Sequence, residues 1–351
     1  MVTFLPVVSW GYAMTVIACA LAGLVAAAVY AWSADLVTFW PARVVLGLLV
    51  VMVPVAGVEP LGNLANLHWF MLMLIPWALL ASPRTLPGLV VVTVATLAAT
   101  LTEPTCLIFA PLAIWRFVTV RRSRTVVIAW AIGVTAQVVT TLVSPRPRNL
   151  AEQQWMSLIL GYVRDVGMSM FTPNPRILGS TVTGLGWWIG IVWVLALFVL
   201  AAVAARWARL DVRVLLLALV LGSVVSWSAA FIANNMPDFY YSLMTADELA
   251  IRIPVRWATA ASAMVPSVIP IATSVLVTRF PRCRSAGWGV LGLMSVVMLV
   301  NVPARSGHDV PPWSTQVEAG FANCRASGTP IQVLTATDDW GLGIPCSYVD
   351  L

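Results

Sequence analysis

The chain has 351 residues, of which 60% are hydrophobic and 10% are charged, and its mean hydropathy is +0.91. These values lie outside the range of soluble domains and indicate a polytopic membrane protein. An outer-membrane barrel is excluded because the apolar runs are continuous and lack the alternation of barrel strands. The net charge of +6 would suit a nucleic-acid partner, so the position of each charge has to be examined before the sum is used.

Apolar runs that approach or reach the length needed to cross about 30 Å of hydrocarbon recur along the chain. In lipid each run must satisfy its own backbone hydrogen bonds, which favours helices. We therefore expect an all-α polytopic membrane protein whose bundle, residues 1–303, has about ten transmembrane helices. The expected spans are centred on residues 10–32, 43–58, 67–81, 87–102, 105–119, 126–143, 185–205, 214–233, 257–278 and 286–303.

Polar residues gather at the edge of the third span, in the stretch GVEPLGNLANLHW. They are Glu59, Asn63, Asn66 and His68, and Trp69 follows them at the depth expected of lipid headgroups. Ionisable groups at a membrane rim are costly to bury and are therefore candidate functional groups. The alternative is structural: Glu59 precedes a proline and marks the end of a helix, and His68 caps the next one.

The fourth and fifth spans are short and are separated by LTEPT, with Glu103 and Pro104 at the break. We expect a short, broken helical hairpin whose tip lies at or below the outer membrane surface. A turn at that depth is tolerated only where protein or a water-filled cavity surrounds it. Glu103 is therefore either a functional carboxylate or a helix stop.

Two longer loops are expected on the same side as this tip. Loop 144–184 carries apolar residues at helical spacing from Trp155 to Met170, opposite Glu152, Gln153 and Asp165, which predicts an amphipathic helix in the membrane interface; a helix packed on the spans is the alternative. Loop 234–256 contains Asp238, Tyr240 and Tyr241, followed by Arg252 and Arg256. These arginines, four residues apart, would share a helical face and hold a phosphate, or would extend to lipid headgroups.

The C-terminal tail, residues 304–351, is polar and forms a small extracytoplasmic segment in this interpretation. WSTQVEAGFANC predicts a short helix and TPIQVLTA one strand. Cys324 and Cys346 lie in this tail, where an oxidising compartment permits a disulfide; two unpaired thiols are the alternative.

The arginines are distributed asymmetrically when the spans are placed alternately. All twenty basic residues are arginine, and the loops on one side carry twelve of them with only Asp35 and Asp211 as acids. The positive-inside rule makes this side cytoplasmic, in a bacterial cytoplasmic membrane, with both chain ends outside. The basic balance therefore reflects topology, and no nucleic-acid partner is expected. An N-terminus on the outer side that has no charged flank is unusual. It predicts either a further span ahead of the first one or an error of one in the number of spans.

The motifs that the sequence lacks narrow the function. It contains no GxxxxGK[ST], HExxH or GxSxG, and its two histidines, His68 and His308, are far apart. We expect no metal and no cofactor. The spans are nearly without charge at mid-depth and show no repeat, which disfavours an ion-coupled transporter.

Four features together resemble the GT-C class of polytopic glycosyltransferases, and in particular actinobacterial membrane proteins similar to that class. They are NLANLHWFMLMLIPWALL entering a span, the broken hairpin TEPTCLIFAPLAIWRF, the amphipathic outer loop, and the tail ending DDWGLGIPC. The resemblance covers most of the chain, although none of these motifs is diagnostic. It implies an enzyme of the cell envelope that takes a sugar from a polyprenyl-phosphate donor on the outer face.

The resemblance also implies roles for the rim residues. Glu59 or Glu103 would be the catalytic base, and Arg252 and Arg256 would bind the phosphate. The residues that would contact the substrates are Asn63, Asn66, His68, Asp238 and Tyr240. The catalytic acid of that class typically lies in the first outer loop, and this chain is expected to begin beyond that loop. The alternative function is a transporter or flippase of lipid-linked glycans, or a non-catalytic membrane subunit.

Overall fold

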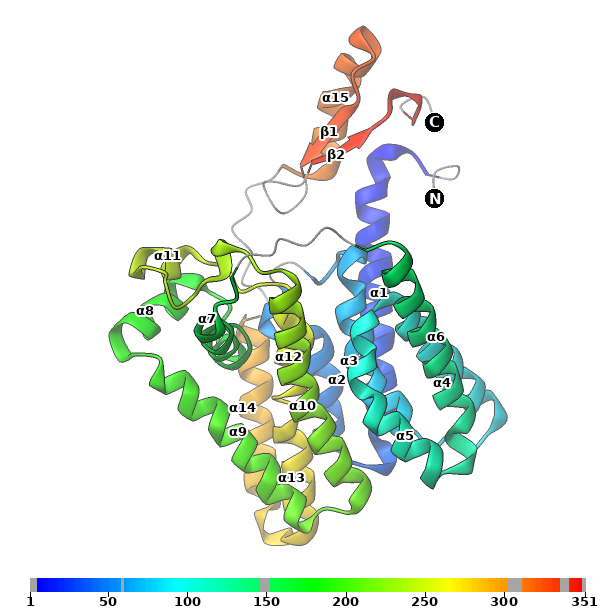
Figure 1. The fold of residues 1–351 in the computed structure, drawn as a ribbon, viewed down its shortest axis with the longest axis vertical. Coiled ribbons are helices and arrows are strands. Elements are labelled where there is room, and N and C mark those ends of the chain that lie inside the picture. Colours follow the sequence, from blue (N-terminus) through cyan, green and yellow to red (C-terminus); the bar gives the residue numbers. More distant parts are fainter. Residues whose placement is uncertain (1–4, 58–59, 146–151, 302–310, 335–340, 349–351) are drawn as a thin grey trace.

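The computed structural model describes residues 5–57, 60–145, 152–301, 311–334 and 341–348. It contains a helical bundle from which one long helix extends toward a small helix-and-sheet tail (Figure 1). The first half of the bundle consists of α1 (Trp10–Trp32), α2 (Trp40–Met52), α3 (Leu67–Leu80), α4 (Leu86–Thr102), α5 (Ala110–Thr119) and α6 (Arg124–Val143). The second half consists of α7 (Trp155–Gly161), α8 (Pro175–Leu185), α9 (Trp188–Trp207), α10 (Leu210–Ala233), α11 (Ala246–Ile251), α12 (Ala258–Met264), α13 (Val268–Arg279) and α14 (Arg284–Asn301).

Seven helical segments in the described part of the chain are long and apolar enough to cross a membrane. They are Val7–Asp35, Trp40–Gly57, Arg121–Val143, Trp188–Trp207, Leu210–Ala233, Ala258–Arg279 and Pro281–Asn301. The other three expected spans correspond to shorter apolar helices, Leu64–Leu80, Leu86–Thr102 and Pro104–Thr119. The expected all-α membrane class is therefore supported, whereas the number of ten spans is not confirmed.

The centre of the bundle is formed by α3 and by the α12–α13 segment. From Phe70 to Leu80 nearly every side chain of α3 is buried, and every residue from Ala258 to Ser274 is buried. Helices α4, α5 and α6 lie on one side of this centre, and α8, α9 and α11 lie on the other (Figure 1). Apolar side chains on the outer helices, such as Val94 and Val199, remain exposed, as lipid-facing positions require.

The inter-helix turns sort into two ends of the bundle. The turns α1–α2, α3–α4, α5–α6 and α9–α10 surround one shared cavity, and Thr278 at the end of α13 bonds Thr38 after α1, Oγ1 to Oγ1 at 2.9 Å. We call this the arginine-rich end, because these turns carry the arginines that the sequence assigned to one side. The loops α2–α3, α4–α5, α6–α9 and α10–α12 lie at what we call the opposite end (Figure 1).

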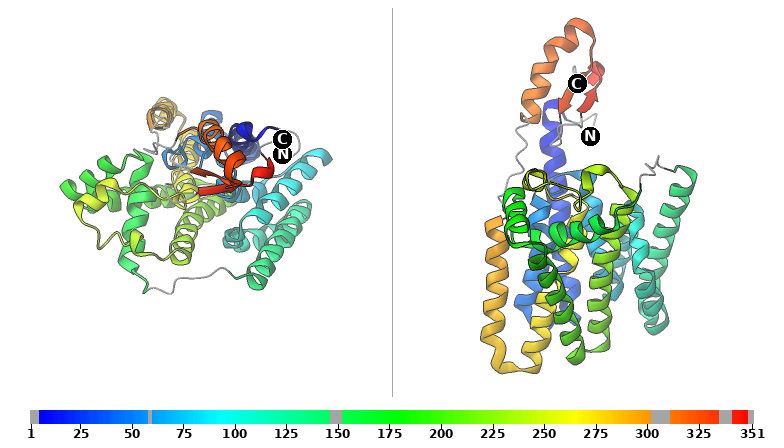
Figure 2. Two further views of the ribbon diagram at one scale, coloured as in Figure 1. Left: turned by 90° about the horizontal axis from the view of Figure 1, so that it is seen from above. Right: turned by 60° about the vertical axis from the view of Figure 1, so that its left-hand side comes forward.

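The α6–α9 loop contains a segment that lies across the long helices (Figure 2). It continues from α7 through a π-helical turn, Tyr162–Gly167, and a 3₁₀ turn, Met168–Met170. Trp155, Met156 and Ile159 are exposed, as expected of an interfacial helix, whereas residues 161–170 are all buried. Its second half is therefore packed on the bundle, and the expectation that Asp165 belongs to a polar outer face is wrong.

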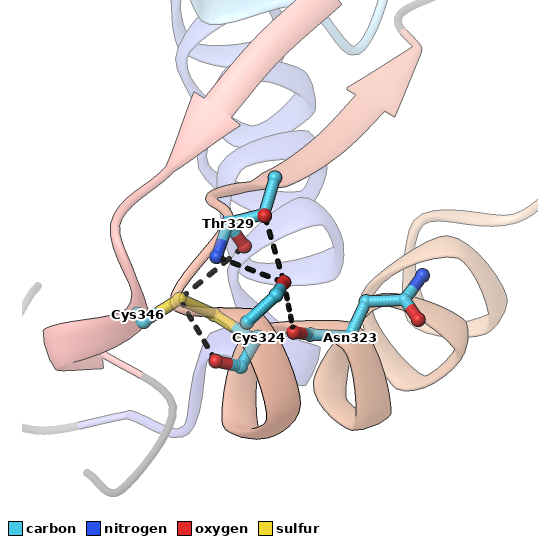
Figure 3. Close-up of a disulfide and its surroundings, with 5 residues drawn as sticks. Asn323, Cys324, Thr329 and Cys346 are labelled. Carbon is cyan, nitrogen blue, oxygen red and sulfur yellow. Dashed lines mark hydrogen bonds between the residues drawn. A yellow bond between two sulfur atoms is a disulfide. The ribbon is translucent and has the colours of Figure 1, made fainter.

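The tail forms a second, smaller core at the opposite end. It consists of α15 (Trp313–Ser327) and an antiparallel pair, β1 (Ile331–Leu334) and β2 (Gly341–Ile344), in which Ile331 faces Ile344. Trp313 donates from Nε1 to the carbonyl of Val7 at 2.8 Å, which attaches the tail to the start of α1. The expected helix is present, but two strands form where one was expected. Cys324 and Cys346 form the expected disulfide between α15 and the chain after β2 (Figure 3).

Candidate functional site

The break between α4 and α5 places a carboxylate at the opposite end of the bundle. Helix α4 ends at Thr102, and Glu103 is extended, with φ −146° and ψ 111°, because the following Pro104 disfavours a helical conformation there. A 3₁₀ helix, Pro104–Phe109, then leads into α5. The predicted break is thus confirmed. Glu103 accepts hydrogen bonds at Oε1 from the backbone N–H of Thr105, at 2.9 Å, and from the Thr105 hydroxyl.

The second carboxylate oxygen of Glu103 lies beside a histidine from the neighbouring helix. The distance from Glu103 Oε2 to His68 Nε2 is 3.8 Å, and the two side chains are 10% and 27% exposed. His68 lies in the first turn of α3, so two rim residues that are 35 positions apart come together. Thr105 fixes one oxygen, and the other lies at ion-pair distance from the imidazole, longer than a hydrogen bond.

Trp69 borders the same pair and has an unusual buried donor. Its ring stands edge-on to the imidazole of His68, with centroids 4.4 Å apart, and its side chain is buried. Its indole N–H is buried without a hydrogen-bond partner among the described residues, as are those of Trp77 and Trp193, but only Trp69 contacts His68. Buried indole N–H groups usually find a partner, so this one is a candidate contact for a ligand hydroxyl.

A buried ion pair, which sequence reasoning did not identify, organises the neighbouring loops. Arg164 and Asp165 lie in the π-helical turn and are both 0% exposed, with Arg164 Nη1 2.6 Å from Asp165 Oδ1. Asp165 Oδ2 accepts hydrogen bonds from the Tyr241 hydroxyl at 2.6 Å and from the backbone N–H of Val255 at 3.2 Å. Burial, and then the charge of Asp165, raise the pKa of Tyr241 well above its usual value. Tyr241 therefore remains a donor to this carboxylate.

The guanidinium of Arg164 also holds the chain that leads into α12. Its Nη2 donates to the carbonyl of Leu249 at 3.1 Å and to the carbonyl of Arg252. The side chain of Arg252 is 32% exposed, lies 4.0 Å from Asp238 Oδ1, and is positioned over the ring of Phe239. The buried Arg164 side chain thus fixes the backbone at Arg252, whose own side chain is partly exposed.

The sequence expected Arg252 and Arg256 to share one helical face, and this expectation is wrong. Helix α11 ends at Ile251, α12 begins at Ala258, and the residues between them are not helical. Pro254 explains the separation, because a helix cannot continue undisturbed through a proline and the residue before it disfavours a helical conformation. The two arginines therefore flank one extended connection.

The other residues that the sequence predicted for the site make structural contacts at the opposite end of the bundle. Asn63 caps a 3₁₀ turn by accepting from the N–H of Ala65, and Asn66 is buried. The hydroxyl of Tyr240 donates to the carbonyl of Glu152 at 3.0 Å. Glu59 lies outside the described residues. The bonds described above therefore form two groups at this end, one around His68 and Glu103 and one around Arg164 and Arg252.

The two groups are connected through the helices that carry them. Helix α12, which follows Arg256, packs directly against α3, whose first turn carries His68, and against the transverse π-helical turn. The described residues contain no cluster of three metal-ligating side chains. No protein-family model, curated protein sequence or solved structure matches this chain.

Proposed function

We propose that this protein is a multi-pass enzyme of the bacterial cytoplasmic membrane that transfers a sugar from a polyprenyl-phosphate donor on the outer face, as GT-C-like glycosyltransferases do. The observation that carries the proposal is the buried Glu103 carboxylate, oriented by Thr105 and lying 3.8 Å from His68. In this proposal the arginine-rich end faces the cytoplasm, and the C-terminal segment is extracytoplasmic.

The proposed reaction uses the two groups in different roles. Glu103 accepts the proton of an acceptor hydroxyl while that oxygen attacks the anomeric carbon of the donor. The bond from the anomeric carbon to the phosphate oxygen breaks, and the phosphate leaves with the electron pair. Arg252 and Arg256 stabilise the charge that develops on this leaving group. Asn63, Asn66 and His68, with Trp69, orient the sugar or the acceptor, and Asp238 and Tyr240 shape the loop beside Arg252.

Three observations support this division of roles. Glu103 and His68 come from separate helices and still lie side by side. Trp69 has a buried donor with no partner among the described residues. The backbone of Arg252 is fixed by a fully buried side chain while its own guanidinium stays accessible, which suits a group that must bind charge without rearranging.

Replacement of Arg252 tests the phosphate role. We expect Arg252→Gln to raise the KM for a radiolabelled polyprenyl-phosphate monosaccharide about tenfold or more, because a charged hydrogen bond to phosphate is lost. The measurement is sugar transfer by the detergent-solubilised full chain. The matched control is Arg176→Gln, an exposed arginine on α8 at the same end, which should leave the KM unchanged.

The same preparation distinguishes transfer from transport. Proteoliposomes loaded with the labelled donor would show its movement between leaflets if the chain is a flippase, and new glycosylated product if it is a transferase. Movement of the donor without product would reject the proposed function in favour of transport. Neither activity would favour a non-catalytic subunit.

A further inference from the structure

The arginine-rich end contains a cavity that the proposed outer-face reaction does not use. Its volume is about 400 Å³, and it lies among four inter-helix segments, at the end of the bundle away from Glu103. The volume falls within the range of small-ligand pockets. A site here would therefore serve a separate ligand.

Three arginines from three different turns line this cavity. Arg122 donates from Nη2 to the carbonyl of Arg84 at 2.7 Å, Arg209 donates to the carbonyl of Asp35, and Arg84 lies 3.5 Å from the Asp35 carboxylate. These bonds hold the turns together, yet each occupies only part of a guanidinium that carries five N–H donors. Several donors on each side chain therefore remain available to a ligand in the cavity.

The charge inside the cavity is nearly balanced. Asp35 and Asp211 are the carboxylates in its lining, so three guanidiniums face two carboxylates and one net positive charge remains. A singly charged phosphodiester matches this balance better than a dianionic phosphate monoester. The carboxylates also provide acceptors for hydroxyl groups of the same headgroup.

Part of the lining is apolar, and its position indicates where the rest of the ligand lies. Leu36, Leu80 and Val120 line the cavity at the ends of the helices, where the apolar body of the bundle begins. A glycerophospholipid matches this arrangement of charged and apolar lining, because its polar headgroup is followed by acyl chains. A wholly soluble anion would leave this apolar surface unused.

We infer that this cavity binds the headgroup of a singly charged anionic glycerophospholipid, with the phosphodiester on Arg84, Arg122 and Arg209 and headgroup hydroxyls on Asp35 and Asp211. The site lies at the end of the bundle that the arginine distribution assigns to the inner leaflet. It is independent of the transferase proposal, since it shares no residue with the opposite end. Its ligand would clamp the three turns.

The test is native mass spectrometry of the detergent-solubilised full chain titrated with phosphatidylglycerol. We expect Arg122→Gln or Arg209→Gln to weaken lipid binding about tenfold, since each removes charged hydrogen bonds. Arg84→Gln should weaken it about threefold, because exposure reduces the contribution of a charged contact. Its side chain is 89% exposed, and its ion pair with Asp35 is screened by solvent and contributes little to stability, so this variant should fold even if the other two do not. The control is Arg282→Gln, an exposed arginine of the α13–α14 turn outside the cavity, whose binding should match the wild type.

Equal lipid binding by the wild type and the folded Arg84→Gln variant would overturn the inference. Competition identifies the source of the phosphodiester. Glycerophosphoglycerol, which lacks acyl chains, should displace the lipid only at an excess of about a hundredfold, because it buries no acyl surface. Displacement at equal concentration would overturn the lipid assignment and identify a soluble phosphodiester.

Discussion

Asp165→Asn is expected to lower the free energy of unfolding by about 3–5 kcal/mol, because it leaves the buried charge of Arg164 without its counter-ion. Both side chains are 0% exposed, so water cannot replace the lost carboxylate. Asparagine preserves the shape of the side chain and keeps an oxygen that can accept from Tyr241 and Val255. The loss of unfolding free energy therefore measures the effect of removing the negative charge. The measurement is unfolding of the purified protein in mixed micelles as the denaturing detergent is increased.

Asp247→Asn is the control for this prediction. Asp247 lies in the first turn of α11 at the same end and is exposed, so its replacement should change the unfolding free energy by less than about 1 kcal/mol. Equal unfolding midpoints for Asp165→Asn and the wild type would mean that the ion pair does not hold the loop 234–256 on the bundle. The account of how Arg252 is positioned would then fail as well.

Glu103→Gln is expected to reduce the rate of sugar transfer by about a hundredfold to ten-thousandfold, the contribution typical of a positioned general base. The amide oxygen of glutamine still accepts from Thr105, so the 3₁₀ helix after α4 should keep its cap and the protein its stability. The change therefore removes the proton acceptor and retains the local fold. The measurement is kcat with the labelled donor at saturation, together with a thermal unfolding midpoint.

Glu318→Gln is the matched control for this second prediction. Glu318 is an exposed glutamate on α15 in the tail, and its replacement should leave both kcat and the unfolding midpoint unchanged. Wild-type turnover by Glu103→Gln would assign Glu103 the structural role of a helix cap. The proposal would then require another base.

The parts of the fold that the sequence predicted follow from strong local rules. Proline after Glu103 predicted the break after α4, and the arginine distribution predicted which turns share an end. The bond from Trp313 to Val7 puts the tail and the start of α1 at one end of the bundle, as two chain ends on one side of the membrane would require. These features depend on steric restriction and on charge counting, which need no knowledge of distant contacts.

The parts that were missed depend on contacts across long sequence separations or on weak local signals. Arg164 and Asp165 lie in a loop where charged residues normally face water, and their partners are about 80 residues away, so their burial has no local signature. Strand β2 reads GLGI, whose glycines disfavour strands. The start of α11 was detectable, because TADE carries the spacing of a capping box.

The most direct test of the account is the side of the membrane on which each end of the bundle lies, since both the transferase proposal and the lipid site depend on it. A membrane-impermeant maleimide can be applied to intact cells and to permeabilised cells. One variant carries Leu243→Cys in the α10–α12 loop, where Leu243 is 66% exposed, with Cys19 and Cys283 changed to alanine. The other changes only Cys19 to alanine and keeps the exposed Cys283 of the α13–α14 turn.

The account predicts that the cysteine at position 243 reacts in intact cells and that Cys283 reacts only after permeabilisation. The reverse pattern would place Glu103 and Arg252 at the cytoplasmic face, and it would contradict sugar transfer on the outer surface.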